Sequence, residues 1–201
     1  MCGRFALGIN YENLKQKLGF TNHVAYRPRY NIAPDDVVLV LREPECLEFM
    51  SWGFSPSWHQ GKPFINARFE TITEKRTFAF SYKNNRCVII ASGYYEWESV
   101  GSSKQPYYVH DPRGLLYMAG IYSENTCAVI TREATTKINR LHSRMPLLLN
   151  ANEVAPWLQR RRKRHLDFTS DFSVNLALHK VSRRINFPSY DNPSCIEVLD
   201  L

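Results

Sequence analysis

The sequence predicts a β-dominated α+β fold, a closed or nearly closed barrel of strands with short flanking helices. Two observations support this prediction, and a third bears on the number of domains. Most apolar segments are short and rich in β-branched or aromatic residues, which favours strands. Only a few segments of helical composition lie between them. The 201 residues are 44% hydrophobic and 22% charged, and no linker or repeat divides them, so we predict a single domain over residues 1–201.

The first helix has the clearest local signals. Asn10 is a suitable N-cap, Leu14 and Leu18 fall on one face, and Gly19 follows, so a helix is predicted at Tyr11–Leu18. Strands are predicted at Val37–Leu41, Leu47–Trp52, Cys87–Ala91, Gly93–Trp97, Tyr107–His110, Leu115–Tyr122, Cys127–Thr131 and Met145–Leu149. Further helices are predicted at Glu74–Lys83, Glu133–Leu141 and Ala151–Arg160, and Val174–Ser182 fits another strand.

The charge balance points to a polyanionic partner. The chain has 26 Lys and Arg against 19 Asp and Glu, a net charge of +7, which favours nucleic acid. The run Arg160–Arg164 fits a solvated face, a phosphate contact or a nuclear localisation signal. No apolar stretch approaches the ~20 residues of a membrane span, and no secretory signal begins the chain, so a cytoplasmic protein is expected.

The cysteines predict neither a disulfide framework nor a zinc site. They are five in number, and none forms a C-x-x-C pair or lies near suitably spaced histidines: Cys2, Cys46, Cys87, Cys127 and Cys195. We therefore expect reduced thiols, no metal and no other cofactor.

Cys2 is unusual because of its position. Removal of Met1, which a small second residue favours, would place its thiol beside a free α-amine with a pKa of ~7.7 to 8.0. With an aldehyde this amine forms a Schiff base, and the thiol can then close a five-membered thiazolidine. The alternative is that Cys2 is an ordinary terminal residue, and retention of Met1 would block this chemistry.

Three further segments carry candidate catalytic groups. Glu96 lies among aromatic residues, which raise a carboxyl pKa toward neutrality, unless it faces outward. His142 beside Arg144 suggests an acid next to an anion contact, or an ordinary surface histidine. Asn66 and Arg68 combine an amide that can orient a substrate with a guanidinium that can bind phosphate, although a turn asparagine fits too.

Several motifs follow one another over roughly residues 1 to 158. They are Met1-Cys2-Gly3-Arg4-Phe5, Arg29-Tyr30-Asn31-Ile32-Ala33-Pro34, Trp52-Gly53-Phe54, Asn66-Ala67-Arg68, Gly93-Tyr94-Tyr95-Glu96-Trp97, Ala119-Gly120-Ile121-Tyr122 and His142-Ser143-Arg144-Met145-Pro146. In content and order they resemble the SOS-response-associated peptidase (SRAP) domain family, whose members sense abasic sites in single-stranded DNA. The resemblance implies an SRAP-like fold.

The resemblance also implies a covalent reaction. Cys2, after loss of Met1, would form a thiazolidine with the C1′ aldehyde of a ring-opened abasic deoxyribose. Glu96 would transfer protons, His142 would protonate the sugar ring oxygen, and Asn66 would position the sugar and the amine. Weak β-elimination from the Schiff base, a lyase activity, is expected as a side reaction.

The resemblance implies DNA contacts as well. Basic residues would bind flanking phosphates and aromatic residues would stack on unpaired bases: Arg4, Arg68, Arg144, Trp52, Phe54 and Trp58. For each aromatic residue a position in the core is the alternative. The expected partner is single-stranded DNA with abasic sites, in the cytoplasm or nucleoid of a bacterium or in a phage.

Two other functions fit the same sequence. A thiol autopeptidase could use Cys2, His142 and Asn66 to release Met1, as the family name suggests. A non-covalent binder of single-stranded nucleic acid would need only the positive charge and the aromatic residues.

Overall fold

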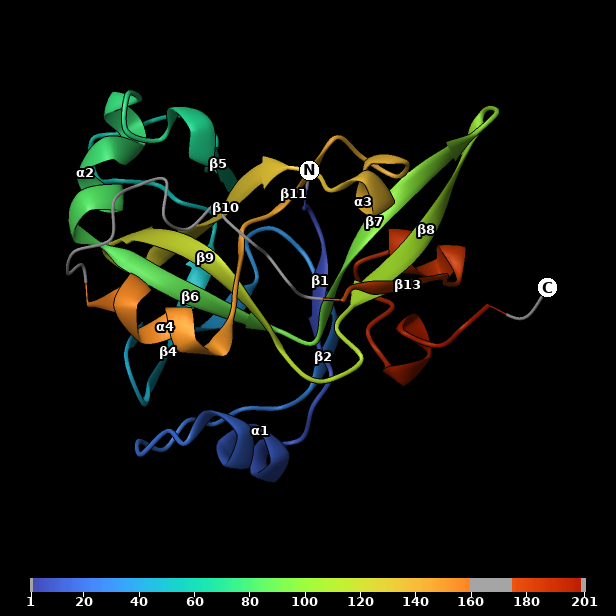
Figure 1. Ribbon diagram of the computed structural model, residues 1–201, viewed down its shortest axis with the longest axis horizontal. Coiled ribbons are helices and arrows are strands. Elements are labelled where there is room, and N and C mark those ends of the chain that lie inside the picture. Colours follow the sequence, from blue (N-terminus) through green and yellow to red (C-terminus); the bar gives the residue numbers. More distant parts are fainter. Residues whose placement is uncertain (1, 160–174, 200–201) are drawn as a thin grey trace.

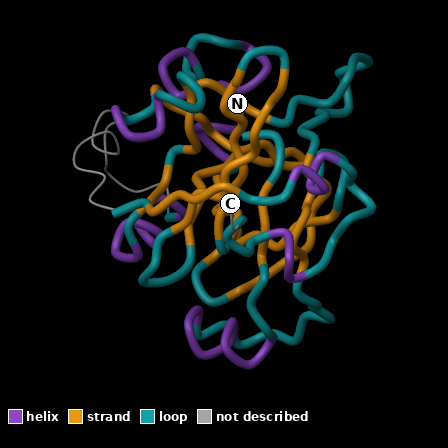
Figure 2. The backbone as a smooth tube through the Cα atoms, turned by 90° about the vertical axis from the view of Figure 1, so that its right-hand side faces the viewer, coloured by secondary structure: helices purple, strands orange, loops and turns teal. Residues whose placement is uncertain are grey.

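The computed structural model describes residues 2–159 and 175–199, so the basic run Arg160–Arg164 lies outside the described residues. Strands form the interior of the molecule, and short helices lie at its periphery (Figures 1 and 2). This confirms the predicted strand-dominated α+β fold. No helix within the described ranges is long and apolar enough to span a membrane.

One sheet has five strands. Its order is β13 (Ala177–Lys180), β8 (Ser103–His110), β7 (Gly93–Val100), β1 (Phe5–Leu7) and β2 (Arg29–Ile32). β1 and β2 were not predicted, because such short strands carry little periodicity. All three residues of β1 are buried, and Phe5 pairs with both Ile32 and Tyr94. The segment after Cys2 is thus fixed in this sheet between β7 and the edge strand β2.

The second sheet has eight strands and curls into a ring. Its strands are β3 (Val37–Glu43), β4 (Cys46–Trp52), β5 (Asn66–Arg68), β6 (Arg86–Ala91), β9 (Leu116–Ser123), β10 (Thr126–Glu133), β11 (Arg144–Pro146) and β12 (Leu148–Leu149). The ring closes because β10 pairs with β9 on one side and with β4 on the other. The contact between β4 and β10 is only two residue pairs long, so the ring is not a regular barrel.

Ser92 and Gly93 join the two sheets where β6 of the ring continues into β7. The Ser92 amide donates to the Ala6 carbonyl at 2.7 Å, and its hydroxyl accepts from the Gly8 amide at 3.0 Å. A Cβ atom on Gly93 would lie 2.4 Å from the Tyr108 ring, so glycine is required there. This corner leads from the ring into β7, the strand that carries Glu96.

The helices are α1 (Tyr11–Leu18), α2 (Arg76–Asn84), α3 (Thr136–Asn139) and α4 (Ala151–Leu158). The predicted α1 is confirmed, with Asn10 Oδ1 accepting from the Asn13 amide and Gly19 at φ 62°. The predicted helix Glu133–Leu141 is wrong in length, because its first residue ends β10 and only one turn is helical. The predicted strand Met145–Leu149 is divided at Leu147, where pairing changes from β10 to β9.

The C-terminal segment is anchored on β2. The buried Asn31 Nδ2 donates to the carbonyls of Ile185, Phe187 and Tyr190 at 2.7 to 3.1 Å. This fixes the neighbouring Asn186, whose Oδ1 accepts from Trp97 Nε1 at 2.8 Å. Residues near the end of the chain therefore lie beside β7.

Candidate active site

A cleft of about 450 Å³ lies over β7 and β8. Its lining comes from β7, β8, the loop before β11 and the C-terminal segment: Glu96, Trp97, Lys104, His142 and Asn186. Two predicted site residues, Glu96 and His142, thus meet in one cavity although they are far apart in the sequence.

Cys2 is fully buried and is held by Asn66. The Asn66 Nδ2 atom donates to the Cys2 carbonyl at 2.9 Å, from β5 at the side of β10. The other amide atom, Asn66 Oδ1, is buried without a partner among the described residues. Burial and the negative charge of Glu96 raise the pKa of the Cys2 thiol. The thiol is therefore protonated at neutral pH and needs a base before it can attack.

Glu96 has the properties of such a base. Its side chain faces inward and is 2% exposed, so the alternative of an outward-facing strand carboxylate does not hold. Burial raises its pKa from 4.5 to about 7, and the positive charge of the amino terminus, a hydrogen bond with that group and a hydrogen bond from the Trp97 backbone limit the rise. Both protonation states are populated near neutrality, which suits a group that must accept and return a proton.

His142 is half-buried with a defined orientation. Its Nδ1 accepts from the Arg144 amide at 2.9 Å, so in the neutral ring the proton lies on Nε2. Burial lowers the pKa of His142, and the positive charges of the amino terminus, Arg144 and Lys104 lower it further. The imidazole is therefore largely neutral at pH 7 and is a stronger acid once protonated.

Two of the three predicted phosphate-binding arginines are engaged inside the protein. Arg144 donates to both carboxylate oxygens of Glu70 at 2.8 Å. Arg4 donates to Asn31 Oδ1 at 2.7 Å and to the Ile185 carbonyl at 2.8 Å. Arg68 is exposed and has no hydrogen bond or ion pair with any described residue. It is the one of the three whose guanidinium is free to meet a phosphate.

The predicted base-stacking residues separate by burial. Trp52 and Phe54 are fully buried, and Trp52 Nε1 donates to the Ile65 carbonyl at 2.9 Å. The expectation that these two rings stack on bases is corrected, because a base cannot reach them in this structure. Trp58 is 62% exposed in the loop after β4 and can make such a contact.

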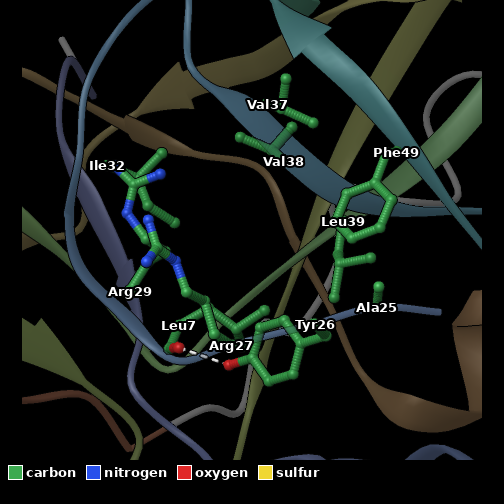
Figure 3. A pocket seen from close by; sticks show the side chains of 10 residues that line it. All are labelled: Leu7, Ala25, Tyr26, Arg27, Arg29, Ile32, Val37, Val38, Leu39 and Phe49. Atoms are coloured by element: carbon green, nitrogen blue, oxygen red, sulfur yellow. Dashed lines mark hydrogen bonds between the residues drawn. The ribbon is translucent and has the colours of Figure 1, made fainter.

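A second cavity, of about 180 Å³, shares no lining residue with the cleft. Figure 3 shows Arg27 and Arg29 on one side of it and Val37, Val38 and Phe49 on the other. The sequence-predicted site residues do not line it, and we assign it no role. No group of three His, Cys, Asp or Glu in the described part of the chain could hold a metal ion.

Comparison with known proteins decides the family. The sequence profile described as SOS response associated peptidase (SRAP) matches residues 1–188. The chain belongs to the SRAP family. Abasic site processing protein YedK of Escherichia coli (strain K12) is 31% identical to this SRAP domain over 177 residues, 79% of this chain and 80% of that protein. Abasic site processing protein YoqW of Bacillus subtilis (strain 168) is 27% identical over 223 residues, 98% and 99% of the two chains.

The SRAP fold is also that of solved structures. A crystal structure of a protein from Bacteroides thetaiotaomicron superposes with a TM-score of 0.87 at 19% identity, covering 98% of this chain and 100% of that one. SRAP relatives also occur in a phage, yeast and vertebrates, such as abasic site processing protein HMCES of Gallus gallus. Family membership therefore does not restrict the source to bacteria and phage.

Sequence reasoning did not single out four residues in or beside the candidate site. Lys104, Trp97 and Asn186 line the cleft, and Tyr94 has a buried hydroxyl that, among the described residues, has no partner. Burial is the main cause of the raised pKa of the Tyr94 hydroxyl. The negative charges of Cys2 and Glu96 raise this pKa further. Tyr94 and Trp97 stood in a motif already noted, whereas Lys104 and Asn186 had no local signal.

Proposed function

We propose that this SRAP domain processes abasic sites in single-stranded DNA by forming a covalent crosslink through Cys2 after removal of Met1. The supporting observation is the convergence of Cys2, Asn66, Glu96 and His142. Asn66 binds the Cys2 carbonyl, the charge of Glu96 acts on the Cys2 thiol, and Glu96 and His142 line one cleft.

The reaction needs an amine, a thiol and a mobile proton. The Cys2 amine adds to the C1′ aldehyde of the open sugar, and loss of water gives an imine. The thiol then adds to the same carbon and its proton ends on the former imine nitrogen, which closes the thiazolidine. One water is released overall, and no oxidant or reductant is required.

Glu96 is the proposed carrier of that proton. As a carboxylate it accepts the proton of the buried thiol, whose raised pKa otherwise keeps it unreactive. As a carboxylic acid it donates to nitrogen. The same two steps in reverse would release the DNA, so Glu96 serves formation and reversal alike.

His142 is proposed to act earlier, when the sugar ring opens. Protonated His142 would donate to the ring oxygen, and its lowered pKa makes this transfer more favourable but less frequently available at pH 7. Asn66 Oδ1, which has no partner among the described residues, would accept from the Cys2 amine and orient it.

The proposed DNA contacts follow from accessibility. Arg68 is free to bind a phosphate and Trp58 can stack on an unpaired base. To bind phosphate through the same atoms, Arg144 would have to break its hydrogen bonds to Glu70, and Arg4 its hydrogen bond to Asn31. We therefore propose that both arginines mainly stabilise the structure of the site.

The test is a denaturing gel of the protein with a single-stranded oligonucleotide that carries one natural abasic site. An intact-mass measurement first establishes that Met1 is absent. We expect a heat-stable adduct with the native protein and with Cys46→Ala, whose half-exposed thiol makes it the matched control. Cys2→Ala should give none. A heat-stable adduct of Cys2→Ala, formed without borohydride, would refute the thiazolidine.

The same experiment separates the alternatives. Peptide cleavage without an adduct would favour a thiol peptidase, and salt-sensitive retention alone would favour a non-covalent binder. The site favours neither, because no hydrogen bond joins His142 to Cys2 among the described residues and burial raises the pKa of the thiol rather than lowering it.

A further inference from the structure

Lys104 is a cation inside the candidate cleft. It lies on β8, opposite Ser99 of β7, and lines the cleft together with His142 and Glu96. Its side chain is exposed and makes no hydrogen bond or ion pair with any residue that the structure describes. Arg144, by contrast, forms an ion pair with Glu70. Lys104 thus presents an uncompensated positive charge to whatever enters the cleft.

This charge acts on His142. Burial is the main cause of the lowered pKa of His142, and the positive charges of the amino terminus, Arg144 and Lys104 add to it. The carboxyl group facing the same cleft is Glu96, which is itself half-protonated near pH 7 because its pKa is about 7. The free protein therefore holds His142 in its neutral form.

We propose that Lys104 binds a phosphate of the DNA strand, and that this phosphate allows His142 to become protonated. The proposal rests on the proposed function and adds a phosphate-binding residue to it. A phosphate placed on Lys104 offsets one of the positive charges that oppose protonation of the imidazole. An anion within ~4–6 Å of a titrating group shifts its pKa by about 1 to 3 units, and partial exposure favours the lower end.

The consequence is an acid that forms when DNA arrives. Without DNA, His142 is neutral and the site is poorly equipped to donate a proton. With the phosphate bound, protonated His142 is available at the moment a sugar ring must open. Lys104 is thus a positioning and binding residue, whereas the proton transfer itself belongs to His142.

The first measurement is binding as a function of salt, with a single-stranded oligonucleotide carrying a tetrahydrofuran abasic analogue. This analogue has no aldehyde and cannot crosslink. Lys104→Met should reduce the slope of log affinity against log salt by about one. Lys17→Met is the control, because this exposed lysine lies on α1, at the bottom of the view in Figure 1, whereas α3 lies in its upper half. It should leave the slope unchanged.

The second measurement is an NMR titration of the His142 ring, assigned with His142→Ala. In the native protein the oligonucleotide should raise the pKa of His142 by about one unit. In Lys104→Met the pKa should start higher without DNA and rise less with it. A merely structural role for Lys104 would not produce this pattern.

Either an unchanged salt slope in Lys104→Met or an unmoved His142 pKa on DNA binding would overturn the proposal. Since the analogue has no aldehyde, failure of the crosslinking experiment leaves both measurements valid. Conversely, a native crosslink with a normal salt slope in Lys104→Met would refute the role of Lys104 alone.

Discussion

Substitution of Glu96 by glutamine should stabilise the protein above pH 7 while slowing its reaction. Burial raises the Glu96 pKa from 4.5 to about 7, so ionisation of the folded protein is unfavourable. One pKa unit corresponds to about 1.4 kcal/mol, and the ionised carboxylate therefore lowers the free energy of unfolding by about 3 kcal/mol above pH 7. A neutral amide of the same shape avoids this loss.

The difference in free energy of unfolding between the native protein and Glu96→Gln should depend on pH. Below pH 4.5 the carboxyl is protonated in both folded and unfolded chains, so the native protein and Glu96→Gln should differ least. Between pH 4.5 and 7 the unfolded chain ionises first, and the stability of the native protein falls as pH rises. Above pH 7 the full difference of about 3 kcal/mol should be present.

Urea denaturation from pH 4.5 to 8 measures this difference. The control is Glu43→Gln, which removes an exposed carboxylate at the end of β3 and should show no such dependence. Single-turnover crosslinking at pH 7 should be slowed by about 10² to 10⁴ in Glu96→Gln. Equal stability of Glu96→Gln and native protein at pH 8 would refute the raised pKa, and an unchanged rate would refute the proton transfer.

Three further predictions concern neighbouring or paired residues. Tyr94→Phe should keep or increase the free energy of unfolding, because the buried Tyr94 hydroxyl has no partner among the described residues. Tyr95→Phe should lower it by about 1 kcal/mol in urea denaturation, because the Tyr95 hydroxyl donates to a backbone carbonyl. Arg68→Ala should reduce the salt slope of DNA binding by about one without loss of stability, while Arg144→Ala should lower the free energy of unfolding by about 1 to 3 kcal/mol. Trp58→Ala should weaken binding to unmodified single strands by about 1 to 3 kcal/mol in a fluorescence titration. The reverse order within either pair, or native affinity in Trp58→Ala, would contradict these assignments.

Local sequence signals determined much of this fold. Asn10 and Gly19 determine the two ends of α1 at the predicted residues, because each acts through hydrogen bonding or backbone conformation within its own segment. The longer strands were predictable for the same reason, since their residue types suit a buried pleated surface. β1, β2 and β5 were not, because three or four residues form a strand only when other strands present partners.

The same division applies to the site. Cys2, Asn66, Glu96 and His142 could be named from the sequence because their chemistry depends on residue type and on short motifs. The sequence could not reveal that Trp52 is buried, that Arg144 is held by Glu70, or that Lys104 reaches the cleft. Exposure and pairing are set by segments distant in the chain, so only the tertiary structure decides which charges and rings are free to meet a ligand.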